Sequence, residues 1–250
     1  MRNVSEIFKK ILNDENHVIE NKVNVNDEDY FEDVLISIET NTNTMKENIP
    51  SVGNCVSSEI DMKMIEPTDA NIPRMAAVMP FVRACVIGEY NCIAGIAIAG
   101  DIVGYIHNCI AGIAKAGETV VGKHDAGLYS EWLQKGKYYI DTRTITHDLE
   151  DENILTIHGY DQMLMLEQMF PSSTMEFPAV DTDVLQEIAD FIGFEIDPRT
   201  FAIMNKHYQI PLPAGYSCRE VVSYIAASYC CNAIFNEIGE LRLVPLKGGG

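Results

Sequence analysis

Two cysteines and two histidines recur at equal spacing in the middle of the chain, and they are the first candidates for chemistry. Cys92, His107, Cys109 and His124 form the pattern C-x14-H-x-C-x14-H. Thiolate sulfur and imidazole nitrogen are ligands that zinc prefers, so the set offers a metal site as one alternative. The spacing matches no usual zinc finger, and a duplication explains the symmetry without a metal. We therefore expect no cofactor and keep these four residues as the zinc candidates.

Acidic residues in the second half of the chain offer a different chemistry. Asp141, Asp161 and the cluster at 150–152 are candidates for the two acids of a glycosidase, which lie roughly 5 to 9 Å apart in a cleft. Acidic turns are common, and the sequence shows no aromatic platform for a sugar. His158, in a strand beside Gly159, is interpreted as a structural histidine. With no nucleotide-binding, nucleophile-elbow or metalloprotease motif in the sequence, we expect no catalytic residues.

The zinc candidates lie in a tandem repeat. Residues 91–107 read NCIAGIAIAGDIVGYIH and residues 108–124 read NCIAGIAKAGETVVGKH, and the two 17-residue blocks agree at eleven positions. Each block has the pattern strand, Ala-Gly-acid turn, strand, which predicts a four-stranded insertion or a pair of hairpins. Its small side chains leave little volume to bury, so we expect the insertion to pack against the rest of an assembly. A face toward a membrane or a partner subunit is the alternative.

Strand and helix patterns on either side of the repeat predict an α+β protein. Segments 137–146 and 154–160 are rich in Ile, Thr and Tyr and predict a hairpin. Four or five strands before Tyr90 favour a small barrel or sandwich. The remaining predictions are helices over 5–13, after Asp161, over 181–193 and after a capping box at Ser217, strands over 55–65 and 75–86, a loop or short extended segment over 198–213, and a hairpin over 233–244.

Composition excludes several classes of function. The chain has 250 residues and a formal charge of −19, from 37 acids and 18 bases. Tight binding of nucleic acid or of an anionic membrane needs clustered Lys and Arg, so both are disfavoured. Seven cysteines at irregular spacing, without a secretory signal, fit a reduced cytosolic environment. No apolar run reaches the roughly 18 residues of a membrane span.

Six segments, in order and at similar spacing, resemble the N-terminal hub region of tail-tip or baseplate hub proteins, the family that includes the phage T4 baseplate hub. The resemblance covers nearly the whole chain outside 88–128. The segments are SVGNCVSSEIDMKMI, IPRMAAVMPFVRA, SEWLQKGKYYIDTRT, ILTIHGYDQML, FPAVDTDVLQEIADFIG and YSCREVVSYIAASYCCNAIFNEIGELRLV.

This resemblance implies a fold and a division into domains. The implied fold is α+β, with a β-barrel hub domain over 1–87 and 129–160, the repeat inserted at 88–128, and a smaller α+β domain over 161–250. The repeat departs from the family, which passes almost directly from the VRA strand to the SEW segment. Members usually continue into a second barrel, so we expect this chain to be a fragment or to work with a separate polypeptide.

The implied function is structural. Proteins of this family form a homotrimer at the tail tip of the virion, close the tail tube, contact tail tube and distal tail proteins, and let DNA pass without tight binding. Assembly takes place in the cytoplasm of the bacterial host. The alternative is a cell-wall-degrading or carbohydrate-binding module of a tail protein, in which Asp141 or Asp161 would be essential.

Overall fold

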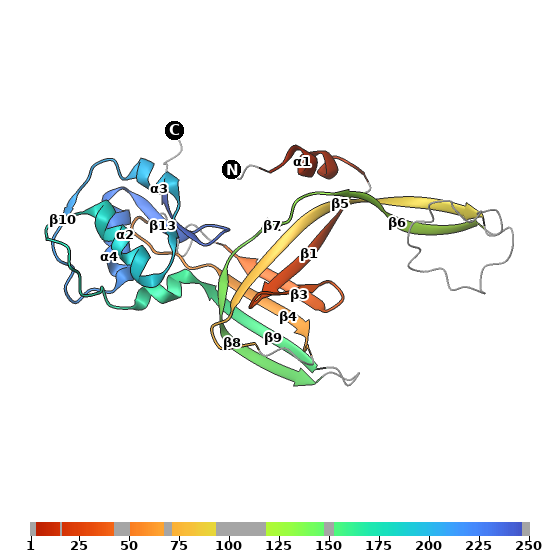
Figure 1. Cartoon of the computed structure of the whole chain (residues 1–250), viewed down its shortest axis with the longest axis horizontal. Coiled ribbons are helices and arrows are strands. Elements are labelled where there is room, and N and C mark those ends of the chain that lie inside the picture. The colour runs from red at the N-terminus through yellow and green to blue at the C-terminus, as the bar shows by residue number, and fades with distance from the viewer. Residues whose placement is uncertain are drawn as a thin grey trace. The chain divides into compact units, whose positions relative to one another are not determined.

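A computed structural model describes residues 4–15, 17–42, 51–67, 72–93, 119–147 and 153–246 of the chain (Figure 1). The chain divides into two compact units. Unit 1 comprises residues 1–21 and 81–133, and unit 2 comprises residues 22–80 and 134–250. Among the described residues, no helix is both long and apolar enough to cross a membrane.

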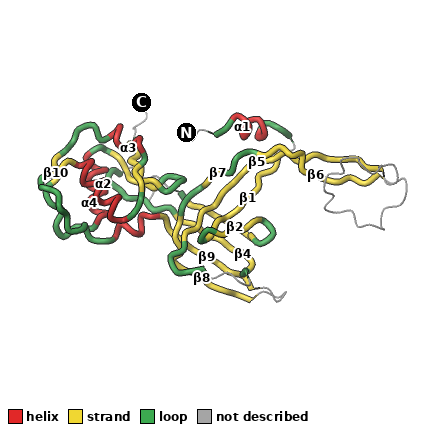
Figure 2. Tube along the Cα trace, in the orientation of Figure 1, coloured by secondary structure: helices red, strands yellow, loops and turns green. Residues whose placement is uncertain are grey.

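Strands and helices alternate unevenly along the chain, as the colours of Figure 2 show. In chain order the elements are α1 (Glu6–Leu12), β1 (His17–Val25), β2 (Glu28–Phe31), β3 (Leu35–Asn41), β4 (Glu59–Ile65), β5 (Ala77–Ile93), β6 (Thr119–Tyr129), β7 (Leu133–Gln134), β8 (Tyr138–His147), β9 (Asn153–Asp161), the 3-10 helix η1 (Gln162–Glu167), β10 (Ala179–Val180), α2 (Asp181–Ile192), β11 (Glu195–Ile196), α3 (Pro198–Ile203), β12 (Gln209–Ile210), α4 (Cys218–Ser228), β13 (Cys231–Phe235) and β14 (Glu240–Pro245).

The large sheet follows the strand order β2-β1-β5-β8-β9-β4-β3. The predicted hairpin is confirmed, because β8 and β9 pair antiparallel from Tyr138 opposite Asp161 to His147 opposite Asn153. Strand β4 shows the predicted alternation, with Ile60, Met62 and Met64 buried. These side chains belong to the core of this sheet, which also includes β1 and β8 residues.

The predicted barrel is corrected to an open sheet. Within the described residues, the strand path ends at β2 and at β3, which do not pair with each other. Alternation of apolar and polar residues fixes which face of a strand is buried. Closure depends instead on strand tilt and on the stagger of the hydrogen-bond register, which a period of two does not encode.

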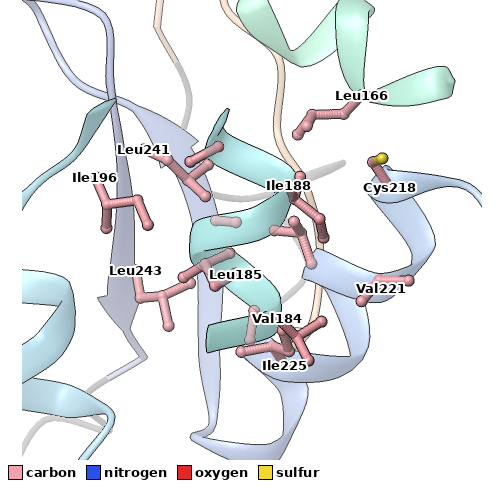
Figure 3. Packing of buried hydrophobic residues seen from close by; sticks show 14 of the residues in the cluster. Leu166, Val184, Leu185, Ile188, Ile196, Cys218, Val221, Ile225, Leu241 and Leu243 are labelled. Carbon is pink, nitrogen blue, oxygen red and sulfur yellow. The ribbon is translucent and has the colours of Figure 1, made fainter. Parts of the chain in front are cut away.

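A second core lies in the C-terminal part of unit 2. Helices α2 and α4 pack their apolar faces against β13 and β14, and the side chains of Leu185, Ile188, Ile225, Leu241 and Leu243 meet between them (Figure 3). The small sheet has the order β11-β14-β13, with β11 parallel and β13 antiparallel to β14.

Local capping signals account for the helix boundaries. Ser217 and Glu220 form the predicted capping box of α4, and Gly193 ends α2 in the left-handed conformation with φ 88°. The loop predicted over 198–213 is wrong at its start, where α3 forms. Asp197 accepts a hydrogen bond from the Arg199 amide at 2.9 Å, and Pro198 occupies the first helical position.

A short segment from the first half of the chain completes the C-terminal part of unit 2. Residues 53–56 run beside β13, with the Gly53 amide donating to the Cys231 carbonyl at 2.8 Å and the Val56 amide donating to the Ala233 carbonyl at 2.9 Å. Gly53 has φ 78°, and a Cβ there would lie 2.8 Å from the Cβ of Ala227 in α4. A glycine is therefore required where this segment crosses the helix.

In unit 1, β5 and β6 are antiparallel neighbours (Figure 1). The register joins the two ends of the tandem repeat, since Asn91–Ile93 lies opposite residues 119–121. Residues 94–118 lie outside the described part of the chain. The hairpins predicted within each block therefore stay a prediction, as does the division into three domains.

Candidate functional site

Asp161 ends β9 and is a buried carboxylate of unit 2 that accepts several hydrogen bonds. It is 3% exposed. Its carboxylate accepts hydrogen bonds from the Ser57 hydroxyl at 2.9 Å, the Ser58 amide at 2.8 Å and the Met163 amide at 3.0 Å. Burial raises the pKa of Asp161, and these hydrogen bonds act in the opposite direction. Asp161 thus caps η1 and joins it to the segment before β4.

Asp161 is one of the candidate glycosidase acids, and this geometry gives it a structural role. Asp141 is exposed on β8, three residues beyond Tyr138, the position opposite Asp161. Three residues of a strand span about 10 Å. Residues 150–152 lie outside the described part of the chain. The acceptor oxygens of Asp161 are held by donors of the protein itself.

A cleft of about 380 Å³ opens beside Asp161. Its wall includes the segment before β8, the end of β3 and the β13–β14 hairpin. Three cationic residues, Lys135, Lys137 and Arg242, line it together with Asp161 and Glu237. Sequence reasoning missed this site because its charged residues come from segments far apart in the chain.

The buried carboxylate of Asp197 lies next to Arg242. Asp197 has a 2% exposed side chain and lies 3.9 Å, from Oδ2 to Nε, from Arg242. Hydrogen bonds from Arg199 are the main cause that lowers the pKa of Asp197 to about 2, and the Asn236 amide also donates to it at 3.2 Å. Asp197 therefore stays ionised and fixes the positions of Arg199 and the β13–β14 hairpin.

Tyr138 also lines this cleft and carries a polar atom with no partner. Its side chain is 1% exposed, and its hydroxyl has no hydrogen-bond partner among the described residues. Burial raises the pKa of Tyr138 to about 12, and the charge of Asp161 adds to the effect. The ring packs on Gly136, where a Cβ would lie 2.2 Å from it. Tyr138 is thus a neutral donor at neutral pH.

His158 lies on the sheet as predicted for a structural histidine. Its Nδ1 is 2.8 Å from Asp61 Oδ1 on the neighbouring strand β4. Its ring meets that of Tyr160 edge to face, with centroids 4.9 Å apart. The side chain is 28% exposed, and both neighbours orient the ring.

In unit 1, the VRA and SEW segments come together although the repeat separates them in sequence. The Ser130 hydroxyl accepts from the Ala84 amide at 2.9 Å, and the Ser130 amide donates to the Ala84 carbonyl at 2.8 Å. The Arg83 guanidinium lies 4.5 Å from the centroid of the Trp132 ring and 2.7 Å from a Glu20 carboxylate oxygen. This stacked ion pair was not foreseen from the sequence.

The zinc candidates are only partly described. The backbone places Cys92 opposite Val120 and His124 opposite Gly88, four residues apart on the β5–β6 ladder. His107 and Cys109 lie outside the described residues. Elsewhere in the described part of the chain, no cluster of three or more His, Cys, Asp or Glu residues has the geometry of a metal site. The zinc alternative therefore stays untested, as does the expectation of no metal.

Comparison with known proteins identifies a fold. No family model and no curated protein matches the chain. Among solved structures it is similar to the 43 kDa tail protein of prophage MuSo2 from Shewanella oneidensis, at 10% identity and a TM-score of 0.53, covering 92% of this chain and 56% of that one. A tail protein of Neisseria meningitidis MC58 aligns at 10% identity and a TM-score of 0.48, covering 90% and 50%. The chain thus spans about half the length of these proteins, and it shares the sheet-rich α+β fold of a prophage tail protein.

Proposed function

We propose that the chain is a structural subunit of a phage tail tip or of the baseplate hub of a tail-like particle. In this role it closes the tail tube as a homotrimer, contacts tail tube and distal tail proteins, and encloses a passage for DNA. The observation that carries the proposal is the fold shared with the MuSo2 tail protein over 92% of the chain.

The charge of the chain supports a conduit. With a net charge of −19 it repels a polyanion, and DNA slides through a passage whose wall does not hold it. The open sheet is an argument for the homotrimer. Its path ends at β2 and at β3, and each of these strands offers an edge to a neighbouring copy.

The proposal assigns the chain no catalysis of its own. Asp161, the acid that a cell-wall-degrading enzyme would need, is buried and accepts three hydrogen bonds from the protein. Clearing of a cell-wall suspension that depends on Asp141 or Asp161 would replace the structural role with the enzymatic alternative.

The decisive measurement is the solution mass by light scattering across a concentration series. The hub role predicts a species of three times the 27.9 kDa chain mass. Electron microscopy of that species should show a ring with a central opening. A monomer at every concentration contradicts the homotrimer.

The passage for DNA has its own test. We expect no retardation of duplex DNA in a gel at about 0.1 M salt, where the screening length is about 10 Å. Salt-sensitive retardation at micromolar protein would contradict an inert passage.

A further inference from the structure

The cleft beside Tyr138 carries a charge opposite to that of the chain. The protein is strongly acidic, yet Lys135, Lys137 and Arg242 line this one cleft. Of its two acids, Asp161 already accepts three hydrogen bonds from the protein. Glu237 is the remaining carboxylate on the wall and is exposed. Asp197, which lies 3.9 Å from Arg242, is also held by hydrogen bonds from Arg199 and Asn236. The three cations on the wall therefore outnumber the carboxylates that are free to pair with them, which favours an anionic ligand.

The neutral part of the wall narrows the class of ligand. Thr40 and Thr42 contribute hydroxyls, which pair with amides and carbonyls. The two aromatic residues of the wall, Tyr138 and Phe235, are 1% and 6% exposed, so neither offers a free ring face for stacking a sugar or a base. The cleft therefore suits a polypeptide better than a carbohydrate or a nucleotide.

We propose that this cleft binds a carboxylate side chain of an extended acidic segment of a partner polypeptide. The planar guanidinium of Arg242 matches a carboxylate in two parallel hydrogen bonds. Lys135 and Lys137 line the same cleft and add positive charge to it. This inference stands apart from the proposed tail role and does not depend on it.

The test uses capped tripeptides as probes and the whole chain as the receptor. Acetyl-Gly-Glu-Gly-amide is titrated into isotopically labelled protein, and the backbone signals of Gly136 and Asn236 are followed by nuclear magnetic resonance. Both residues lie on the cleft wall. We expect saturable shifts with a dissociation constant of about 1 mM, which salt weakens. The matched probe acetyl-Gly-Gln-Gly-amide should bind about tenfold more weakly, which corresponds to about 1.4 kcal/mol.

Variants distinguish binding of the probe by the cleft from its attraction to charge elsewhere on the surface. Arg242→Gln should weaken the acidic probe by about tenfold or more, and Lys135→Gln, at an exposed site, should weaken it without disturbing the fold. Lys63→Gln removes the same charge from an exposed position of β4 outside the cleft wall and should leave binding unchanged.

Three outcomes with the peptide probes overturn the proposal. They are equal binding of the Glu and Gln probes, equal effects of Lys135→Gln and Lys63→Gln, and no saturable shift up to about 50 mM probe. Inorganic phosphate is the third probe. If it shifts the same signals as strongly as the acidic peptide does, the cleft is a general anion site and the polypeptide assignment fails.

Discussion

Replacing Asp161 by Ala is the sharpest test of how the described sheet is joined to η1. The carboxylate accepts from the backbone amides of Ser58 and Met163 and from the Ser57 hydroxyl. Alanine has no side-chain oxygen, so all three donors lose their acceptor. The Ser57 hydroxyl can turn elsewhere, whereas the two amides are fixed by the backbone and lose their partner.

The size of the effect follows from those two amides. A buried N–H group left without an acceptor costs about 1–3 kcal/mol. Two such groups predict a loss of about 2–6 kcal/mol in the free energy of unfolding. Burial raises the pKa of Asp161, which shows that burying the charged carboxylate costs free energy. This cost offsets part of the stability that the hydrogen bonds of Asp161 contribute. We therefore expect the lower half of this range.

Urea unfolding at neutral pH, followed by circular dichroism, measures this loss. Asp141→Ala, at an exposed position of β8, is the matched control and should change stability by less than about 0.5 kcal/mol. In a double-mutant cycle, Ser57→Ala should cost about 1 kcal/mol alone and almost nothing when Asp161 is already Ala. If Asp161→Ala falls within about 0.5 kcal/mol of the unchanged protein, the joining role is refuted.

Three further changes test other parts of unit 2 by the same unfolding assay. Leu185→Ala removes a fully buried side chain from the C-terminal core and should cost about 2–5 kcal/mol; a loss below about 1 kcal/mol would show that this core is loosely packed. Gly136→Ala places a Cβ 2.2 Å from the Tyr138 ring and should cost about 1–3 kcal/mol, and an unchanged midpoint would contradict that contact. Asp197 has its pKa lowered from 3.8 to about 2, so its charge stabilises the fold above pH 3.8 and the gain is lost as the pH falls through about 2. Asp197→Asn should therefore cost about 2 kcal/mol at neutral pH, with the two stability curves converging in acid; a gap that does not depend on pH would disprove the linkage.

Elements with strong local signals were predictable from the sequence. Gly193 marks the C-terminal end of α2, and the pair Ser217 and Glu220 marks the N-terminal end of α4. The structure confirms both helices. The β8–β9 hairpin follows from residue type alone. The helix expected after Asp161 forms as the short 3-10 helix η1.

Features that depend on distant pairing were not predictable. The open path of the large sheet replaces the expected barrel because edge closure has no local signature. Helix α3 differs from the loop predicted over 198–213, although Asp197 as the cap and Pro198 in the first turn are a local signal for a helix. The charged cleft brings Lys135 and Arg242 together from separate segments, which a linear pattern does not reveal.

The pairing of residues 53–56 with β13 has a consequence for synthesis of the chain. Asn54 and Asn232, which hydrogen-bond in this pairing, are separated by 178 residues. At about 5–20 residues per second, a ribosome makes the second partner roughly 9 to 36 seconds after the first. Throughout that interval the early segment has no strand to join, and the small sheet is finished only when nearly the last residues of the described chain emerge.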